Sequence, residues 1–271
     1  LFLALSLPAL AAEQKESTYD RVVRTKTLRC AYTIYPPFFE KDPNTKKFSG
    51  FSYDMAEEIG KQLGLKVEWT EEVGSDNMFA GLRAGRYDAI CPGYSMTASR
   101  TWGGDFTHPF TFVPFYFYVK ANDNRYKENE DLNHKGVRLA TMDGELSQIV
   151  VHEDFPLAQE VSLPGLTAGS DRLEMVASGK VDATPMEPSI ALEYMAHNPG
   201  KLKQLNDKTL RMQGLVLIIP HNEFDLERML VSTIDTMAWN GIIEKIVKKH
   251  TKYPGSILLP ALPYQPAPPK H

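Results

Sequence analysis

Two long apolar stretches divide this 271-residue chain and constrain its fold more than any other feature. The first, FTFVPFYFYVK at 110–120, ends one series of alternating strand and helix patterns, and the second, GLVLII at 214–219, ends another. Strands that alternate with helices predict parallel sheets covered by helices. Two such series joined by two crossing strands predict two lobes with a cleft between them, a shape suited to hinge closure over a ligand.

The first series supplies three predicted strands, at 27–33, 66–71 and 88–91. Met55, Ile59 and Leu63 recur every four residues between the first two, which predicts a helix with one apolar face. Phe79 and Leu82 belong to a shorter helix before the third strand. The residues that precede this series are polar, and we expect them to form a loose lead-in.

The second series repeats the pattern, with predicted strands and helices at 137–142, 146–153, 161–163, 170–178, 181–185 and 190–195. After the second crossing strand, Leu226, Leu230, Ile234 and Met237 predict an amphipathic helix, and a shorter helix follows. Residues 252–271 contain six prolines and no helical period, so they predict an extended tail.

The N-terminal segment LFLALSLPALAAEQ has the apolar core of a secretory signal, and Ala9-Leu10-Ala11 forms a small-x-small cleavage site. We therefore expect residues 1–12 to be the remainder of a signal peptide. No Cys follows the cleavage site, and no later stretch reaches the roughly 18 apolar residues of a membrane span. These observations predict an exported, soluble protein without a lipid anchor.

Composition and motifs exclude several function classes. The formal net charge of −4 gives no reason to expect a nucleic-acid partner. The chain has no P-loop, no GxGxxG and no zinc-type Cys/His spacing, so we expect neither a cofactor nor a metal. Cys30 and Cys91 fall in predicted strands, where they form either a disulfide or two small buried side chains.

The residues after the third predicted strand, GYSMTASR at 93–100, are polar and lack apolar periodicity. In an open α/β sheet, small ligands bind at the carboxyl ends of the strands. A guanidinium placed there beside hydroxyl and backbone N–H groups is suited to hold a carboxylate in a bidentate manner. Arg100 is therefore the first candidate ligand-binding residue, with an ordinary surface ion pair as the alternative.

At this point the chain resembles a known family, the extracytoplasmic solute-binding proteins of the polar amino-acid uptake type (family 3), which serve ABC transporters. The resemblance covers about residues 28–250. Its landmarks are YPPF, GFSYDMAEEIGKQLG, AGRYDAI, GYSMTASR, DFTHPF, GVRLATMDGE, SGKVDATPMEPS and NGIIEKIVKKH, in that order. Their order and spacing together are highly specific.

The resemblance implies a two-lobed periplasmic-binding-protein fold of type II, with two parallel-core sheets flanked by helices and joined by two crossing strands. Lobe 1 would then comprise residues 13–114 and 220–251, and lobe 2 residues 115–219. In this family the residue matching Arg100 binds the ligand α-carboxylate, and the residue matching Glu187 pairs with the α-ammonium. The positions that match Gly93, Ser95, Thr97 and Gly144 supply supporting groups around the ligand, and the aromatic residue that matches Tyr35 packs on the ligand side chain.

Three positions depart from the family pattern. A carboxylate, Glu145, follows Gly144 where a small hydroxyl is usual, and Tyr32 stands where an Asp is common. Glu187 replaces the commoner Asp, which moves its carboxylate about one methylene further into the cleft. Either the ligand carries an additional positive charge that Glu145 and Glu187 share, or it is not a standard α-amino acid. The alternative for Glu145 is a solvated residue in the first turn of a helix, and for Tyr32 and Tyr35 it is packing within a lobe.

The sequence thus predicts a periplasmic, monomeric binding protein without catalytic residues, which captures a zwitterionic or cationic amino-acid-like solute and delivers it to a membrane permease. The first alternative is a lyase of the cyclohexadienyl dehydratase type on the same fold, since Glu145 or Glu187 can act as a general acid if burial raises its pKa. The second is a sensory protein that presents its ligand to a receptor.

Overall fold

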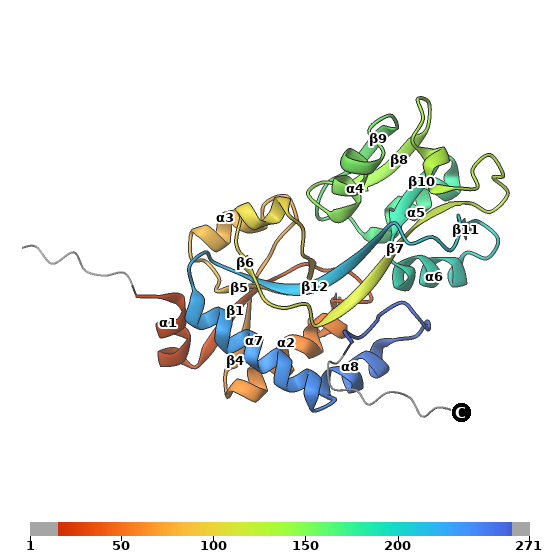
Figure 1. Cartoon of the computed structure of the whole chain (residues 1–271). Helices are drawn as coiled ribbons and strands as arrows, with labels where there is room; N and C mark the ends of the chain where they lie inside the picture. The colour runs from red at the N-terminus through yellow and green to blue at the C-terminus, as the bar shows by residue number, and fades with distance from the viewer. Residues whose placement is uncertain (1–15, 262–271) are drawn as a thin grey trace, which may run out of the picture.

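The computed structural model describes residues 16–261, and the expected signal segment at 1–12 and the end of the tail lie outside the described residues. In Figure 1 the elements gather into two bodies connected by two long strands. Among the described residues, no helix is long and apolar enough to cross a membrane.

The first body is built on three parallel strands in the order β4-β1-β5, which span Lys66–Glu72, Thr27–Tyr32 and Ala89–Ser95. They are connected through α2 (Phe51–Leu63) and α3 (Met78–Arg83). The apolar stripe of α2 is buried, with Met55 and Ile59 fully covered. The predicted β-α-β-α-β series is therefore present, and β5 extends further than predicted, to Ser95, because its polar end pairs with a crossing strand.

The crossing strands are β7 (Thr111–Lys120) and β12 (Arg211–Ile219), which pair with each other in antiparallel fashion. Beyond the paired segment, β12 continues alongside β5 and the short β6 (Asp105–Phe106) in the first body. In the other direction β7 continues alongside β10 and β11 in the second. Both strands thus belong to both bodies, as Figure 1 shows.

The second body continues from β7 in the order β10-β8-β9, with β8 parallel to both of its neighbours. Its strands and helices are β8 (Arg138–Met142), α4 (Leu146–Asp154), β9 (Gln159–Leu163), α5 (Gly169–Ser178), β10 (Ala183–Met186), α6 (Pro188–His197) and β11 (Leu202–Gln204), preceded by the 3-10 helix η2 (Asn129–Leu132). The predicted fold class, two lobes with parallel-core sheets joined by two crossing strands, is confirmed.

The C-terminal helices return to the first body. Helices α7 (Phe224–Trp239) and α8 (Ile242–His250) both pack against α2. The predicted apolar stripe of α7 is buried. The tail then runs back to the crossing strands, where Leu258 exchanges backbone hydrogen bonds with Phe112 of β7. The lobe boundaries stated above stay a prediction, since β7 and β12 are shared.

The expected loose lead-in is wrong for its described part, which contains α1 (Thr18–Thr25). The Ser17 side chain caps this helix by accepting a hydrogen bond from the Asp20 N–H. Arg21 anchors the helix by an ion pair with buried Asp88. The helix has a single fully buried residue, Val22, so it lacks the apolar period that signals longer helices.

Three further features position the loops around the strand ends. Strands β2 (Glu40–Lys41) and β3 (Phe48–Ser49) form a small hairpin after β1, and the 3-10 helix η1 (Ser99–Trp102) follows β5. Cys30 of β1 and Cys91 of β5 form a disulfide with 5.4 Å between their Cα atoms, which decides between the two alternatives left open by the sequence.

Candidate ligand-binding site

A cavity of about 80 Å³ lies where the strand ends of the two lobes face each other. Its volume is enough for several water molecules or a small solute. Both lobes and both crossing strands contribute to the wall, whose residues are Thr33, Tyr35, Phe38, Phe39, Ser52, Ser75, Cys91, Gly93, Tyr94, Ser95, Arg100, Val113, Met142, Glu145, Gly165, Thr167, Glu187, Gln213 and Leu215. Six of the nine predicted site residues are among them.

Arg100 is the cationic side chain of the lobe 1 wall. It lies in η1 and is 5% exposed. Its Nη1 donates to the Ser95 carbonyl at 2.9 Å and to the Ser95 hydroxyl at 2.8 Å, and its Nη2 donates to the Gly144 carbonyl at 2.9 Å. Its Nε is buried without a partner. Burial lowers the pKa of Arg100 from its ordinary value. Within residues 16–261, the guanidinium therefore has one N–H without a partner and no carboxylate bonded to it.

The other predicted residues of this segment support Arg100. Gly93 has φ of 106°, and a Cβ there would lie 2.6 Å from the Ser52 hydroxyl, so this position requires glycine. The Thr97 hydroxyl accepts a hydrogen bond from the Arg100 backbone N–H at 3.3 Å. Thr97 itself does not line the cavity. It shapes the turn that brings Arg100 to the wall.

Gly144 brings lobe 2 against lobe 1. Its φ is 71°, and a Cβ there would lie 2.6 Å from the Asp76 backbone nitrogen. The backbone of the two lobes can approach this closely only because position 144 has no side chain. Gly144 does not line the cavity; its contribution is the carbonyl that accepts from Arg100. The lobes are thus in contact across the cleft.

Glu187 is the most deeply buried carboxylate of the lobe 2 wall, at 6% exposed. It follows β10 and precedes α6, and its Oε1 accepts from Gln213 Nε2 at 3.3 Å. Burial, and then the nearby Glu145 carboxylate, raise the pKa of Glu187 to about 7 against the opposing effect of Arg172. A bound cation beside Glu187 would stabilise its charged form.

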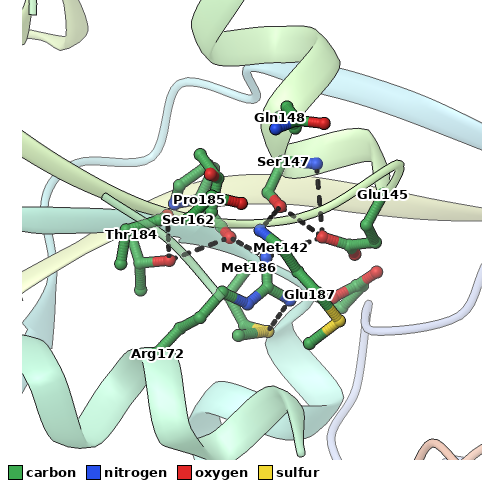
Figure 2. Close-up of polar contacts among 12 residues, drawn as sticks. Met142, Glu145, Ser147, Gln148, Ser162, Arg172, Thr184, Pro185, Met186 and Glu187 are labelled. Carbon is green, nitrogen blue, oxygen red and sulfur yellow. Dashed lines mark hydrogen bonds and ion pairs between the residues drawn. The ribbon is translucent and has the colours of Figure 1, made fainter. Parts of the chain in front are cut away.

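Glu145 lines the cavity wall and is the N-cap of α4, and its side chain is only 12% exposed, so it is not the solvated first-turn residue of the alternative drawn from the sequence. Its Oε2 accepts from the Ser147 backbone N–H at 3.3 Å and from the Ser147 hydroxyl. Nη1 of Arg172 donates to the same oxygen at 2.7 Å (Figure 2). Glu145 is therefore paired within the protein.

Arg172 is a residue of this network that the sequence analysis did not identify. It projects from α5 toward Glu145 and Glu187, as Figure 2 shows, and is 0% exposed. Burial by itself lowers the pKa of Arg172, but the carboxylates of Glu145 and Glu187 outweigh this effect and raise the pKa above its ordinary value. Arg172 shares the buried face of α5 with Leu173 and Val176. A charged residue on an apolar stripe was the available signal.

The Tyr35 hydroxyl connects lobe 1 to this network. It lies 3.3 Å from Glu145 Oε1 and 3.1 Å from Glu187 Oε2, and it accepts from Arg172 Nη2 at 2.9 Å. A phenol has one hydrogen to donate. It can therefore satisfy only one of the two carboxylates at a time.

Tyr32 lies away from the cavity. It is 7% exposed and packs in an aromatic cluster with Phe39, Phe48 and Trp69, at ring-centroid distances of 5.2, 4.9 and 6.1 Å. The structure thus places it in lobe packing, the alternative stated for it, because its ring is enclosed by these three aromatic side chains. Its neighbour in sequence Tyr35 reaches the cavity from the loop instead.

The fold and these residues can now be compared with known proteins. The family described as bacterial extracellular solute-binding proteins, family 3, matches residues 28–253. The chain belongs to this family. As a family 3 member it is a solute-binding protein, which confirms the resemblance drawn from the sequence landmarks.

Two relatives and one solved structure illustrate the likeness. A probable amino-acid ABC transporter-binding protein of Haemophilus influenzae is 31% identical over 183 residues, 67% of each chain. A probable histidine-binding protein of Campylobacter jejuni is 26% identical over 221 residues, 80% of this chain and 81% of the relative. The crystal structure of an ancestral amino acid-binding protein, described as a precursor of cyclohexadienyl dehydratase, aligns with a TM-score of 0.76 at 26% identity and covers 88% of this chain and 100% of its own.

Proposed function

We propose that this family 3 protein captures a small amino-acid-like solute, zwitterionic or cationic, between its lobes and delivers it to the permease of an ABC transporter. It does so as a monomer in the periplasm. The observation that carries this proposal is the buried guanidinium of Arg100, which has a free Nε and, among the described residues, no bonded carboxylate. The relatives named as amino-acid-binding proteins support the same class of solute.

In this mechanism the ligand carboxylate accepts from the Nε and one Nη of Arg100, and the ligand ammonium lies against Glu187. Charge-assisted hydrogen bonds of this kind are about twice as strong as neutral ones. They strengthen further when closure of the lobes removes water from around them. Ser95 holds the guanidinium in place, and Gly93 allows the ligand close to the end of β5.

Tyr35 and Gly144 act in closure. Each is in contact with the opposite lobe, Tyr35 through its hydroxyl and Gly144 through its carbonyl. If the ligand carboxylate accepts the N–H that Arg100 now donates to the Gly144 carbonyl, the guanidinium exchanges one acceptor for another and loses no hydrogen bond. The differential affinity of the ligand for the closed form then sets the population of that form.

A thermal-shift screen of the purified mature protein against the twenty amino acids, polyamines and small organic acids tests the proposal. A true ligand raises the melting temperature in a concentration-dependent way, because it binds the native state alone. We expect amino acids with free α-carboxylate and α-ammonium groups to do so. Their methyl esters, which lack the carboxylate charge, serve as the matched control and should leave the melting temperature unchanged. A response to esters and free acids alike would contradict the proposal.

A second candidate function is a lyase of the cyclohexadienyl dehydratase type. One observation favours it: Glu187 is a buried carboxyl group with a pKa of about 7, so a large share of it is protonated at neutral pH and can act as a general acid. The ancestral protein that aligns with this structure is described as an amino acid-binding protein that preceded such an enzyme, so that likeness by itself supports binding. Incubation with the bound ligand distinguishes the two functions, since a binding protein returns its ligand unchanged and a dehydratase releases water and a new product.

A further inference from the structure

The cavity wall contains two carboxylates, but they are not equally available to a ligand. Oε2 of Glu145 already receives a guanidinium N–H, a backbone N–H and a hydroxyl. Glu187 receives neutral donors only, from Gln213 and Tyr35. A carboxylate bonded to neutral donors keeps its net charge, whereas one paired with a guanidinium does not present it to a ligand.

The pairing of Glu145 is built into lobe 2. Arg172 is completely buried, and two of its nitrogens donate to the network, Nη1 to Glu145 and Nη2 to the Tyr35 hydroxyl. Among the described residues, its buried Nε has no hydrogen-bond partner. Arg172 itself does not line the cavity. A countercharge stabilises a fully buried cation of this kind, because its transfer from water costs several kcal/mol.

The charges of the site therefore balance without a ligand side chain. Among the described residues that line the cavity, the charged ones are Arg100, Glu145 and Glu187. With Glu145 paired to Arg172, one cation and one anion remain, which matches an α-carboxylate and an α-ammonium. The rest of the wall offers aromatic, aliphatic and neutral polar side chains to the ligand side chain. A lysine or arginine side chain would thus enter the cavity without a free anion.

We propose, on the basis of the proposed function, that Arg172 is a specificity-determining residue that neutralises Glu145. The site therefore prefers amino acids of zero net charge to cationic amino acids. Arg172 acts through Glu145 and Tyr35 and is a positioning residue that does not touch the ligand. In its absence, Glu145 becomes an additional anion at the cavity wall and favours a ligand with a second positive charge.

The test measures dissociation constants at pH 8 by isothermal titration calorimetry for glutamine and methionine, which carry no net charge, and for lysine and arginine. The wild-type protein should bind the uncharged pair more tightly. Arg172→Met should shift the ratio of the two affinities toward lysine and arginine by about tenfold or more, the size expected for one charge in a partly dry site. Arg172→Lys, which keeps the charge, should retain the wild-type order.

Two further variants separate specificity from folding. The double variant Glu145→Thr with Arg172→Met removes both charges and should prefer the uncharged ligands again, even if Arg172→Met alone fails to fold. Arg138→Gln is the matched control, since it removes a lobe 2 arginine whose partner, Asp182, lies outside the cavity wall. It should leave the ratio unchanged.

Tighter wild-type binding of lysine or arginine would overturn this inference while the proposed function stands. A folded Arg172→Met protein with an unchanged ratio would do the same, as would a double variant that prefers lysine. Failure of the wild-type protein to bind any free amino acid would overturn the proposed function and the inference together.

Discussion

Each half of the cleft contains one buried arginine, and the two have opposite kinds of partner. Arg100 of lobe 1 donates to two carbonyls and a hydroxyl, whereas Arg172 of lobe 2 donates to the Glu145 carboxylate. Their pKa values reflect this difference, since burial lowers that of Arg100 and the neighbouring carboxylates raise that of Arg172. A buried charge without a countercharge is costly to the free protein and is stabilised when an anion binds. The comparison identifies Arg100 as the ligand cation and Arg172 as an internal one.

The largest expected effect is on affinity. Arg100→Gln should weaken the binding of an amino-acid ligand by at least about 30-fold, because truncating one partner of a buried, hydrogen-bonded charge pair costs about 2–5 kcal/mol. Calorimetry with the tightest ligand of the screen measures the loss. Arg24→Gln, which changes a surface arginine paired with Glu16, is the control and should bind normally. Near-normal affinity of the Arg100 variant would remove the distinction between the two arginines.

The second prediction concerns the stability of the protein without ligand. Here the variant of Arg172 should have the larger effect and the variant of Arg100 the smaller one. Arg172→Met should lower the free energy of unfolding by about 3 kcal/mol, because it leaves the Glu145 carboxylate of a buried pair without its partner. Arg100→Gln should change it by no more than about 1 kcal/mol, since the loss of the guanidinium hydrogen bonds is offset by the removal of an uncompensated buried charge. Urea unfolding of both variants decides the order. Equal losses would mean that both arginines are structural.

The sequence predicted one of these arginines and not the other, for a physical reason. Arg100 follows an apolar strand in a run of hydroxyl and glycine residues, so its position relative to the sheet can be inferred from local pattern. Arg172 lies on the buried stripe of an otherwise ordinary helix. Its partner is 27 positions earlier, on another element, and only the folded chain brings the two together.

Other differences have the same origin. Tyr32 was predicted to line the site because the family landmark places it near Tyr35, but Tyr32 is the last residue of β1, and the face of the sheet on which its side chain lies is fixed by the alternation of that strand. Trp69 of β4 receives it. Helix α1 was missed because it depends on contacts made by Arg21 with Asp88, 67 residues away. The layered fold itself was predictable, since it follows from periodicities that are repeated over both halves of the chain.

The third prediction concerns pH and the anion that faces Arg100. Glu187 has a pKa of about 7 without ligand, and an ammonium ligand needs its charged form. Affinity should therefore fall roughly tenfold between pH 8 and pH 6, because the carboxyl must lose a proton before it binds the ligand. The groups that face it are Glu145, Arg172, Tyr35, Tyr118 and Gln213.

The stability of the ligand-free protein should change with the opposite sign. A carboxyl whose pKa is raised by folding stabilises the protein below its unfolded value, near 4.5, and that contribution is lost as the pH rises toward 7. The amount is about 3 kcal/mol for a shift of this size. Glu187→Gln should make stability less dependent on pH over this interval and flatten the pH profile of the binding that it retains. An unchanged profile in this variant would assign the titration to another group.

The smallest expected effect is that of Tyr35→Phe, which tests whether the charge balance depends on Arg172 or on the whole network. The variant keeps the ring, which stacks near Phe38 at a centroid distance of 6.4 Å, and removes the hydroxyl that accepts from Arg172. The hydroxyl bonds other protein groups, so its loss acts on the ligand only indirectly and affinity should fall only a few-fold. The loss should be equal for uncharged and cationic amino acids, because Arg172 still bonds Glu145 directly at 2.7 Å. Calorimetry with glutamine and lysine measures both. A change of preference toward lysine would show that the hydroxyl, and not the guanidinium alone, keeps Glu145 from the ligand.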